Sequence, residues 1–249
     1  METNSRSDHG NNIATENQYG QTLGTPLTDW TPPPFPQEIA EQGNYCRLEI
    51  LNPKKHTFDL YTANTEDISP ASWTYLPYGP FESLKDYSTW LAAQSKLNDQ
   101  QFYAIMDNRT NKAVGLAAYL RIAPNAGSIE VGHLKFSPLM QRTPVSTEAM
   151  YLMMKHAFQL GYRRYEWKCN TLNTPSKEAA LRLGFQFEGI FRQAQIVKGH
   201  NRDTAWFSVI DQEWPVLSTA FEQWLSPFNF DTEGNQVERL ADIRASLLP

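Results

Sequence analysis

The sequence has few of the features that would assign it to a metal-binding or disulfide-rich class. It contains two cysteines in 249 residues, Cys46 and Cys169, and they do not form a cluster. Two unclustered cysteines give neither a zinc site nor a disulfide framework, so we expect no metal. Cys169 lies in a strand-like run, where an inert, buried thiol is expected.

Long apolar runs and concentrated positive charge are also missing. No run approaches the ~20 apolar residues of a membrane span, and the polar N-terminal segment does not resemble a signal peptide. The net charge is −5, and the strongest basic run is Arg163-Arg164. That run is too short for a nucleic-acid-binding stripe. We therefore expect no nucleic acid and no membrane as partners, and a cytoplasmic location by default.

The composition divides the chain into three parts. Residues 1–43 are rich in Asn, Thr, Gln and Pro. They predict a polar tail, because such segments bury too little apolar surface to offset their ordering entropy. We expect residues 44–215 to form one folded domain. Residues 216–249 predict a loosely packed helical extension.

The order of the expected elements favours a mixed sheet. Before residue 171, strand patterns occupy 46–51, 101–107, 113–122, 129–136 and 162–170. Helical patterns occupy 58–66, 83–94, 148–161 and 174–184. Two further strands surround a turn at 199–203. A meander followed by strand–helix–strand units predicts the α/β class, with a mixed, mostly antiparallel central sheet flanked by helices.

The segment QRTPVSTEAM, residues 141–150, contains no glycine, although it joins an expected strand to an expected helix. Thr143 suits the N-cap, and Pro144 suits the first helical position, where its missing N–H costs nothing. Glu148 is expected near the first turn, where it would complement the helix dipole. Free amides at a helix N-terminus can bind an anion without glycine. The plainer interpretation is an ordinary capped helix.

Four segments follow one another in an order and spacing that match a known family. IEVGHLKF (129–136) is similar to a strand that splays open beside an acyl-CoA, and QRTPVSTEAM is similar to a pyrophosphate loop. NTPSKEAALRLGFQFEG (173–189) matches the pattern Asn-x-x-Ser, short helix, Gly-Phe and Glu-Gly. KGHNRDTAWFSVIDQEW (198–214) is similar to a closing hairpin. Together, over about residues 45–215, they resemble the GNAT superfamily of acyl-CoA-dependent N-acetyltransferases, in the branch of ribosomal-protein N-terminal acetyltransferases.

This resemblance implies a fold, a co-substrate and a set of site residues. The sheet would splay between its two central strands, and acetyl-CoA would donate its acetyl group to a primary amine that attacks the thioester directly. The acceptor is either a small-molecule amine or a peptide N-terminus. The residues implied in cofactor binding are Leu134, Phe136, Gln141, Arg142, Thr143, Val145, Ser146, Thr147, Asn173 and Ser176.

Two of these residues have specific implied roles, and two positions depart from the family pattern. Asn173 would hydrogen-bond the pantetheine arm, or it is simply a helix cap. Ser176 would protonate or stabilise the departing thiolate, or it is simply an exposed serine. Pro144 replaces the usual glycine of the loop, and Arg142 occupies another position that is often glycine. Because most amide donors are kept, we expect the loop still to bind CoA, with an affinity that Pro144 can reduce.

The group that accepts the amine proton is not evident from the sequence. Related enzymes carry a carboxylate after the Glu-Gly motif, where this chain has Gln195, which cannot act as a base. Glu130 is the catalytic candidate, acting through a water chain, and His133 and Glu166 are alternatives. For each of these the plainer interpretation is structural. Tyr119 and Tyr165 are further unassigned candidates.

The aromatic segment SWTYLPYGPF (72–81) is the expected wall of an acceptor pocket. The predicted substrate-binding residues are Trp73, Tyr75, Tyr78 and Glu166. The alternative is a packed loop whose rings complete the core. For Arg202 and Asp203, we expect an ion pair within the hairpin turn rather than contacts with the acceptor.

Three functions are therefore compatible with the sequence. The first is an N-acetyltransferase. Gln195 and the altered loop motivate the second, a CoA-binding or sensing protein without transferase activity. The third is a domain that has lost its ligand and serves as a partner surface, and the aromatic-rich tail and C-terminal helices would allow a homodimer.

Overall fold

The structure, a computed structural model, describes residues 15–39, 42–67 and 69–248. Its contacts divide the chain into two units, Met1–Thr31 and Pro32–Pro249. In the first unit, β1 (Thr15–Glu16) and β2 (Thr22–Leu23) pair as a short antiparallel hairpin. The first 14 residues of the expected tail lie outside the described residues.

The larger unit is built on a seven-stranded sheet with the order β3-β4-β5-β6-β7-β9-β8. Neighbouring strands are antiparallel, except that β6 and β7 are parallel. This arrangement confirms the predicted mixed, mostly antiparallel sheet. The strands are β3 (Cys46–Ile50), β4 (Gln101–Asp107), β5 (Lys112–Ala123), β6 (Ser128–Phe136), β7 (Arg164–Asn170), β8 (Gln186–Val197) and β9 (His200–Ile210).

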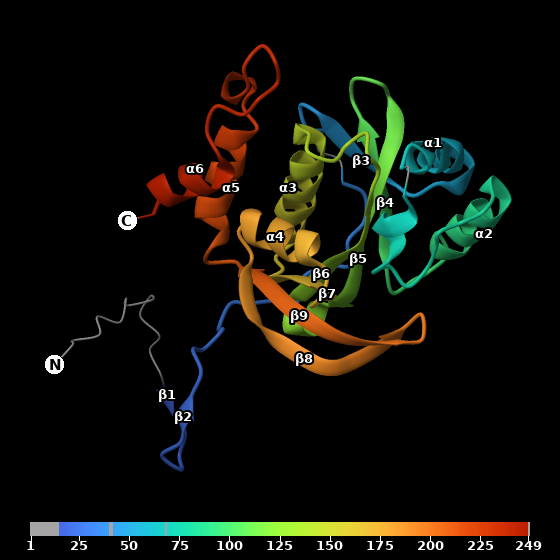
Figure 1. Cartoon of the computed structure of the whole chain (residues 1–249). Coiled ribbons are helices and arrows are strands. Elements are labelled where there is room, and N and C mark those ends of the chain that lie inside the picture. Colours follow the sequence, from blue (N-terminus) through green and yellow to red (C-terminus); the bar gives the residue numbers. More distant parts are fainter. Residues whose placement is uncertain (1–14, 40–41, 68, 249) are drawn as a thin grey trace. The chain divides into compact units, whose positions relative to one another are not determined.

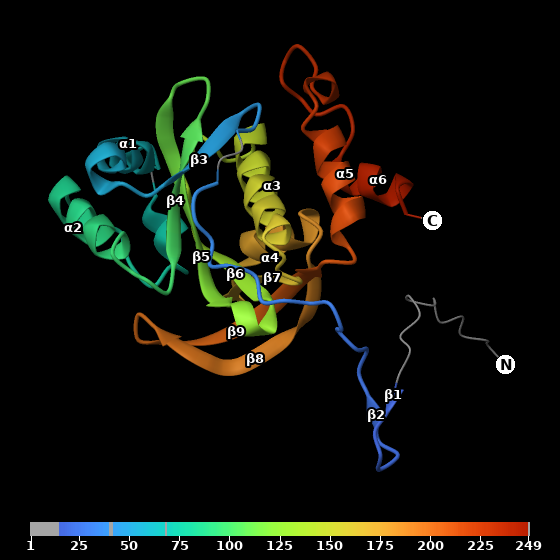
Figure 2. The ribbon, with the colours of Figure 1, turned by 180° about the vertical axis from the view of Figure 1, so that it is seen from behind.

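Helices cover both faces of this sheet (Figures 1 and 2). The helices α1 (Pro53–Thr65) and α2 (Leu84–Gln94) lie on one face, and α3 (Pro144–Gln159) and α4 (Thr174–Arg182) lie on the other. Two more helices, α5 (Trp214–Trp224) and α6 (Leu240–Ser246), lie beyond α3. Short 3₁₀ turns occur at Pro70–Trp73, Pro124–Ala126 and Pro227–Asn229. Within the described ranges, no helix has both the length and the apolar character needed to cross a membrane.

Helix α1 is longer than the sequence pattern predicts. The expected helix starts at residue 58, but the observed helix starts at Pro53. Asn52 is its N-cap, and the side chain of Asn52 accepts a hydrogen bond from Lys54 N. Asparagine at the cap followed by proline at the first helical position is a favourable helix start, and this signal was overlooked.

Helix α3 buries an apolar face against the sheet. Met150, Met153, Met154 and Ala157 are all buried in the core on that side of the sheet. A second core fills the other face, under α1 and α2, and its large side chains include Leu60, Tyr87, Leu91 and Phe102. The sheet is therefore covered on both faces.

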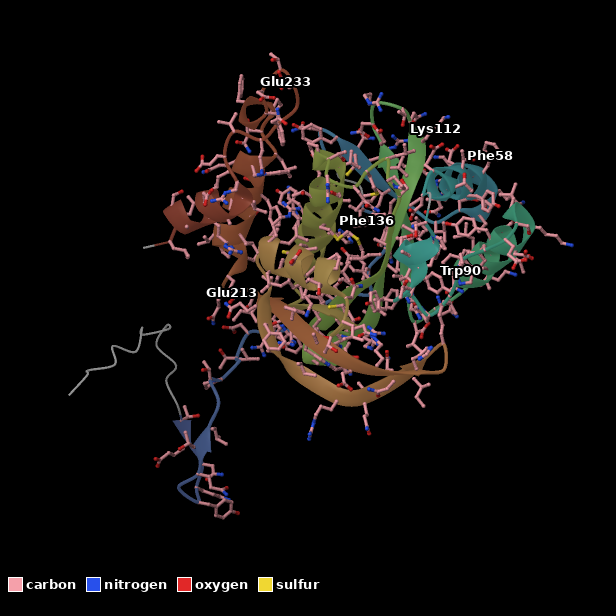
Figure 3. The ribbon with its side chains drawn as sticks, in the orientation of Figure 1. Phe58, Trp90, Lys112, Phe136, Glu213 and Glu233 are labelled. Atoms are coloured by element: carbon pink, nitrogen blue, oxygen red, sulfur yellow. The ribbon has the colours of Figure 1, made fainter. Side chains whose placement is uncertain are left out.

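The C-terminal helices pack more tightly than predicted. In α5, Leu217, Phe221 and Trp224 are buried in the same core as α3. Trp214 stacks on Phe158 with ring centroids 5.1 Å apart. The expectation of a loosely packed extension is wrong in this respect, because α5 carries an apolar stripe at helical spacing that has to be buried. Figure 3 labels Glu213 just before α5 and Glu233 in the loop that follows it.

Residues before the expected start of the domain also contact the core. Ile39 is 4% exposed, and the hydroxyls of Tyr103 and Tyr162 donate hydrogen bonds to the carbonyl oxygens of Gln37 and Pro34. The contacts thus group the segment from Pro32 with the larger unit. A division into tail, domain and extension that fold separately remains a prediction.

Glu148 does not complement the helix dipole, contrary to expectation. It lies in the second turn of α3 and is buried, and its carboxylate faces the chain that enters β3. There it accepts three backbone hydrogen bonds, from the N–H groups of Asn44, Tyr45 and Cys46, at 2.7, 2.6 and 2.6 Å. A Cβ atom on Gly43 would lie only 2.1 Å from the carboxyl carbon, so this approach requires glycine.

Candidate active site

The two central strands separate and leave a cavity between them. The strands β6 and β7 are paired only from Ser128 and Arg164 to Val131 and Trp167. Beyond these pairs, β6 continues to Phe136 and β7 to Asn170. A cavity of about 520 Å³ lies at this divergence. The predicted splay between the central strands is therefore confirmed.

A bulge in β6 coincides with the point of separation. On the β5 side, Leu116 pairs with Lys135 and Ala118 pairs with Gly132, so β6 has one extra residue in this interval. His133 has a φ of 52°, in the left-handed region that non-glycine residues rarely adopt. Strained backbone of this kind is often found at functional sites. Since β7 no longer pairs with this segment, that strand does not engage its backbone N–H groups.

Ser176 and Asn173 both line the cavity from the start of α4. The side chain of Asn173 accepts a hydrogen bond from Ser176 N at 3.3 Å, so Asn173 is the N-cap of α4. The Ser176 Oγ accepts a hydrogen bond from Trp167 Nε1 at 3.1 Å. An indole N–H can only donate, and a serine hydroxyl can both donate and accept. The Ser176 hydroxyl proton therefore points away from Trp167. A hydrogen bond from the Ser176 side chain lowers the pKa of the Cys169 thiol in part, against the effect of burial, and Cys169 lines the same cavity.

A network of charged side chains forms another part of the wall. Glu130 is 3% exposed and pairs with Arg121 at 2.7 Å and with Lys168 at 2.8 Å. Lys168 also pairs with Glu166 at 2.7 Å, and Glu166 pairs with Arg164 at 2.7 Å. Burial raises the pKa of Glu130, and the charges of Arg121 and Lys168 lower it in part. Glu166 belongs to the network but does not line the cavity.

His133 lines the cavity beside this network. Its ring stacks on Tyr78 with centroids 5.6 Å apart, and its Nδ1 lies 3.1 Å from the Tyr78 hydroxyl. Burial, with the nearby charges of Arg121 and Arg202, lowers the pKa of His133 to about 4. The imidazole is therefore neutral at pH 7.

The low pKa of His133 predicts a pH dependence of stability. The unfolded chain binds a proton here near pH 6.5, whereas the folded protein binds one only near pH 4. Stability is therefore lost as the pH falls between these values, by about 2 kcal/mol at pH 4.5. The variant His133→Phe keeps a ring between Tyr78 and Phe102, and it should lose correspondingly less. The measurement is urea unfolding of both proteins at pH 7 and pH 4.5, and an equal loss in both would contradict the assignment.

Gln195 and Arg202 face the cavity from the hairpin of β8 and β9. Arg202 Nη1 donates to Gln195 Oε1 at 2.7 Å. The expected turn ion pair is wrong, because the turn consists of Lys198 and Gly199, with φ of 51° and 77°, and Arg202 lies within β9. Asp203 instead accepts from Gln193 N at 2.7 Å.

The aromatic segment 72–81 contributes fewer rings to the cavity than predicted. Tyr75 lines it, and its hydroxyl donates to Leu172 O at 3.1 Å. Trp73 is 6% exposed and belongs to the core. Tyr78 stacks on the His133 ring and does not itself line the cavity. Lys198 Nζ donates to the carbonyl oxygens of Trp73 and Gly79, at 2.9 and 2.8 Å, which ties the hairpin tip to this segment.

A second cavity, of about 570 Å³, lies at the N-terminus of α3. As expected, Thr143 occupies the N-cap and Pro144 the first helical position. The Thr143 hydroxyl donates to Met140 O and does not cap the helix, so it leaves the first amides of α3 uncapped. Arg142 has a φ of 58°, the conformation that favours glycine. The predicted loop residues that line this cavity are Arg142, Thr143, Ser146 and Thr147.

The remaining residues that were predicted to bind the cofactor lie in different parts of the structure. Leu134 lines the cavity at the splayed strands. Phe136 lies at the end of β6, close to α3 (Figure 3), and packs with Val145 against the core. Gln141 is bound to Phe136 O through its Nε2 at 2.8 Å. None of these last three lines either cavity.

Other sequence candidates for proton transfer are remote from the cavity. Tyr119 and Tyr165 are buried in the core, at 0% and 1% exposure, and burial raises the pKa of both. Neither lines the cavity. Cys169 does line it, but the thiol is 5% exposed and burial raises its pKa, which confirms the expected inert cysteine.

Comparison with known proteins identifies the family. The profile of the acetyltransferase (GNAT) domain family matches residues 47–186. The chain belongs to the GNAT acetyltransferase family. It is similar to the crystal structure of a GCN5-related N-acetyltransferase from Brucella melitensis, with 45% identity and a TM-score of 0.86 over 88% of this chain and 100% of that one. It is also similar to a probable GNAT-family acetyltransferase from Chromobacterium violaceum, with 41% identity and a TM-score of 0.71 over 76% of this chain and 94% of that one.

A curated relative within the same comparisons is more distant. It is the ribosomal-protein-serine acetyltransferase of Escherichia coli, which is 27% identical over 107 residues. The match covers 42% of this GNAT chain and 59% of that protein, so it spans less than two thirds of the relative's length.

The sequence interpretation missed two positive charges of the site, Arg121 and Lys168, and favoured a turn ion pair for the third, Arg202. Arg121, Lys168 and Arg202 all line the cavity of this GNAT domain. Lys168 lies two residues after Glu166 on the same strand, so it was predictable that their side chains share one face of the sheet. Arg121 and Arg202 come from strands β5 and β9, and only the register of the whole sheet brings them together.

Proposed function

We propose that the protein transfers the acetyl group of acetyl-CoA to a primary amine, and that the acceptor is the N-terminus of a protein. The observation that carries this proposal is the Ser176 hydroxyl at the splayed strands. Its oxygen accepts from Trp167, so its proton can turn from Cys169, which lines the same cavity, to the sulfur of CoA. A thiolate leaving group needs such a proton donor at the moment when the C–S bond breaks.

The residues at the N-terminus of α3 fit the pyrophosphate of acetyl-CoA. The first amides of the helix are not capped by Thr143, and the positive end of the helix favours an anion. Arg142 and Arg182 add positive charge to the same cavity. Pro144 removes only a donor that is not needed at the first helical position. The turn without glycine therefore keeps the features of a phosphate site.

The charges of the cavity at the splayed strands favour an uncharged acceptor amine. Three cations line it, Arg121, Lys168 and Arg202, against one carboxylate, Glu130. A positive surrounding lowers the pKa of an amine, since it disfavours the ammonium form. The neutral amine attacks the thioester carbonyl, and backbone N–H groups near the bulge at His133 stabilise the negative charge on the oxygen. Glu130 accepts the amine proton through water, and Ser176 protonates the sulfur.

The choice of a protein N-terminus rests on the distant relative. The Escherichia coli protein is named for the acetylation of a ribosomal-protein serine. We extend to this chain the acceptor class, an N-terminal amine, and not that particular target. Thiol release from acetyl-CoA with short N-terminal peptides tests the proposal. Binding of acetyl-CoA without thiol release for any amine would instead support a CoA-sensing role.

A change at Asn173 tests the cofactor site separately. In Asn173→Asp the carboxylate keeps the N-cap of α4 but lacks the amide N–H₂ that would donate to the pantetheine arm. We expect acetyl-CoA to bind about tenfold more weakly, a loss of ~1.4 kcal/mol. Calorimetric titration of wild type and variant measures this. Unchanged affinity, with the fold intact by circular dichroism, would restrict Asn173 to its capping role.

A further inference from the structure

We propose that Arg202, together with Arg121, forms a subsite for a carboxylate carried by the acceptor close to its amine. This inference rests on the proposed function, because it concerns the acceptor of that reaction. Both guanidinium groups line the cavity at the splayed strands. They reach it from β9 and β5, on either side of the two strands that separate.

Arg202 has unused hydrogen-bonding capacity inside the cavity wall. Its Nη1 donates to the neutral amide oxygen of Gln195. Its Nε is buried and has no hydrogen-bond partner among the described residues. In the described part of the chain, no carboxylate forms an ion pair with Arg202. A buried guanidinium N–H without an acceptor is unfavourable, so the site is completed by an acceptor oxygen from outside the chain.

The other charges of the wall do not supply that oxygen. Glu130 is shared between Arg121 and Lys168, and Lys168 is also held by Glu166. Among the three cations of the described wall, Arg202 is the one with no carboxylate within ion-pair distance. Burial and the charge of Arg121 lower the pKa of Arg202, and the charges of Cys169 and Glu130 raise it in part.

A carboxylate matches this arrangement in charge and in geometry. It would relieve the repulsion between Arg202 and Arg121, and a guanidinium can bind a carboxylate through two parallel hydrogen bonds. An acceptor with a lysine at the same place would meet like charge. The carboxylate has two possible sources, an Asp or Glu side chain next to the N-terminus of a peptide, or the α-carboxylate of a free amino acid.

The first experiment compares acceptors that differ only in this carboxylate. Thiol release is followed with peptides that begin Ser-Asp, Ser-Asn and Ser-Lys, and with free serine and serinamide. We expect kcat/KM to be at least tenfold higher for Ser-Asp than for Ser-Asn, mainly through KM, and lowest for Ser-Lys. A preference for serine over serinamide that exceeds the peptide preference would identify the free amino acid as the source. Equal values for the charged and neutral members of both pairs would overturn the subsite.

The second experiment tests the subsite without turnover. Calorimetry with CoA present measures the binding of the acetylated peptides Ac-Ser-Asp and Ac-Ser-Asn. Tighter binding of the Asp peptide supports the subsite even if no thiol release is found, in which case only the proposed transferase function fails. Equal binding overturns the subsite while leaving the transferase function to the kinetic assay.

Variants of Arg202 locate the effect. In Arg202→Met, and in Arg202→Lys, which keeps the charge but loses the planar fork, the ratio of Asp to Asn should fall toward one in binding and in kcat/KM. The matched control is Arg192→Met, on the same hairpin but away from this cavity. It should keep the wild-type ratio. A ratio that survives in both folded Arg202 variants would overturn the role of Arg202.

Discussion

Replacing Ser176 by alanine is expected to lower kcat about 10³-fold, which corresponds to ~4 kcal/mol. The hydroxyl oxygen accepts from Trp167, so its proton points away from the indole and can be given to the departing sulfur. That proton is transferred only as the C–S bond breaks, so the loss should appear in kcat and leave the dissociation constant of acetyl-CoA within a few-fold. Steady-state thiol release and calorimetric titration measure the two quantities.

Two control variants separate chemistry from structure. Ser83→Ala removes a serine hydroxyl at the start of α2, where it accepts from Asp86 N. This variant should lose about 1 kcal/mol of stability and keep its kcat. Trp167→Phe keeps a buried aromatic ring, although a smaller one, and removes the N–H that orients the Ser176 hydroxyl, and a loss of about tenfold is expected. A Ser176→Ala enzyme with wild-type kcat would show that water, not this serine, protonates the leaving group.

Replacing Glu148 by alanine is expected to lower the free energy of unfolding by about 4 kcal/mol. The buried carboxylate accepts three short hydrogen bonds from consecutive backbone N–H groups. Hydrogen bonds to a charged acceptor are stronger than neutral ones, and the variant leaves these donors without a partner. Urea unfolding at pH 7, followed by fluorescence, gives the difference.

Two further substitutions in this protein test the prediction, one as a control and one as the second member of a double-mutant cycle. Glu178→Ala changes an exposed helical glutamate of α4 and should alter stability by less than about 0.5 kcal/mol. Gly43→Ala places a methyl group against the Glu148 carboxylate and should destabilise the wild type. The same change should cost less in the Glu148→Ala background, where the space is open. Additive effects of the two substitutions would show that Gly43 is not selected by contact with Glu148.

The parts of the site that local sequence patterns control were predictable. Asn173 and Ser176 sit at the start of a helix whose proline and apolar spacing are plain in the sequence, and the structure places both in the cavity. Thr143 and Pro144 likewise take the first positions of α3. These are short-range signals, because capping involves only a few consecutive residues.

The predictions that were wrong concern residues whose positions depend on contacts between distant segments. Glu148 was assigned to the dipole of its own helix, yet its partners lie about 100 residues earlier. Trp73 was expected at the acceptor, but the second core holds it. Arg202 was assigned to a turn because the two-residue turn at Lys198 was not recognised. In each case the residue type was informative, and its neighbours in space were set by sheet register and packing.

The cavity at the N-terminus of α3 also has a wall from the far end of the chain. Trp224, Phe230 and the segment 234–236 line it together with Arg142 and Thr147. The residues around Ser176 come from earlier elements, between the 3₁₀ turn Pro70–Trp73 and β9. The nucleotide end and the reactive end of the co-substrate would thus be held by separately encoded stretches. Substitutions after α5 can therefore alter how tightly the cofactor is held while the residues that perform acyl transfer stay unchanged, so affinity and chemistry can evolve independently in this chain.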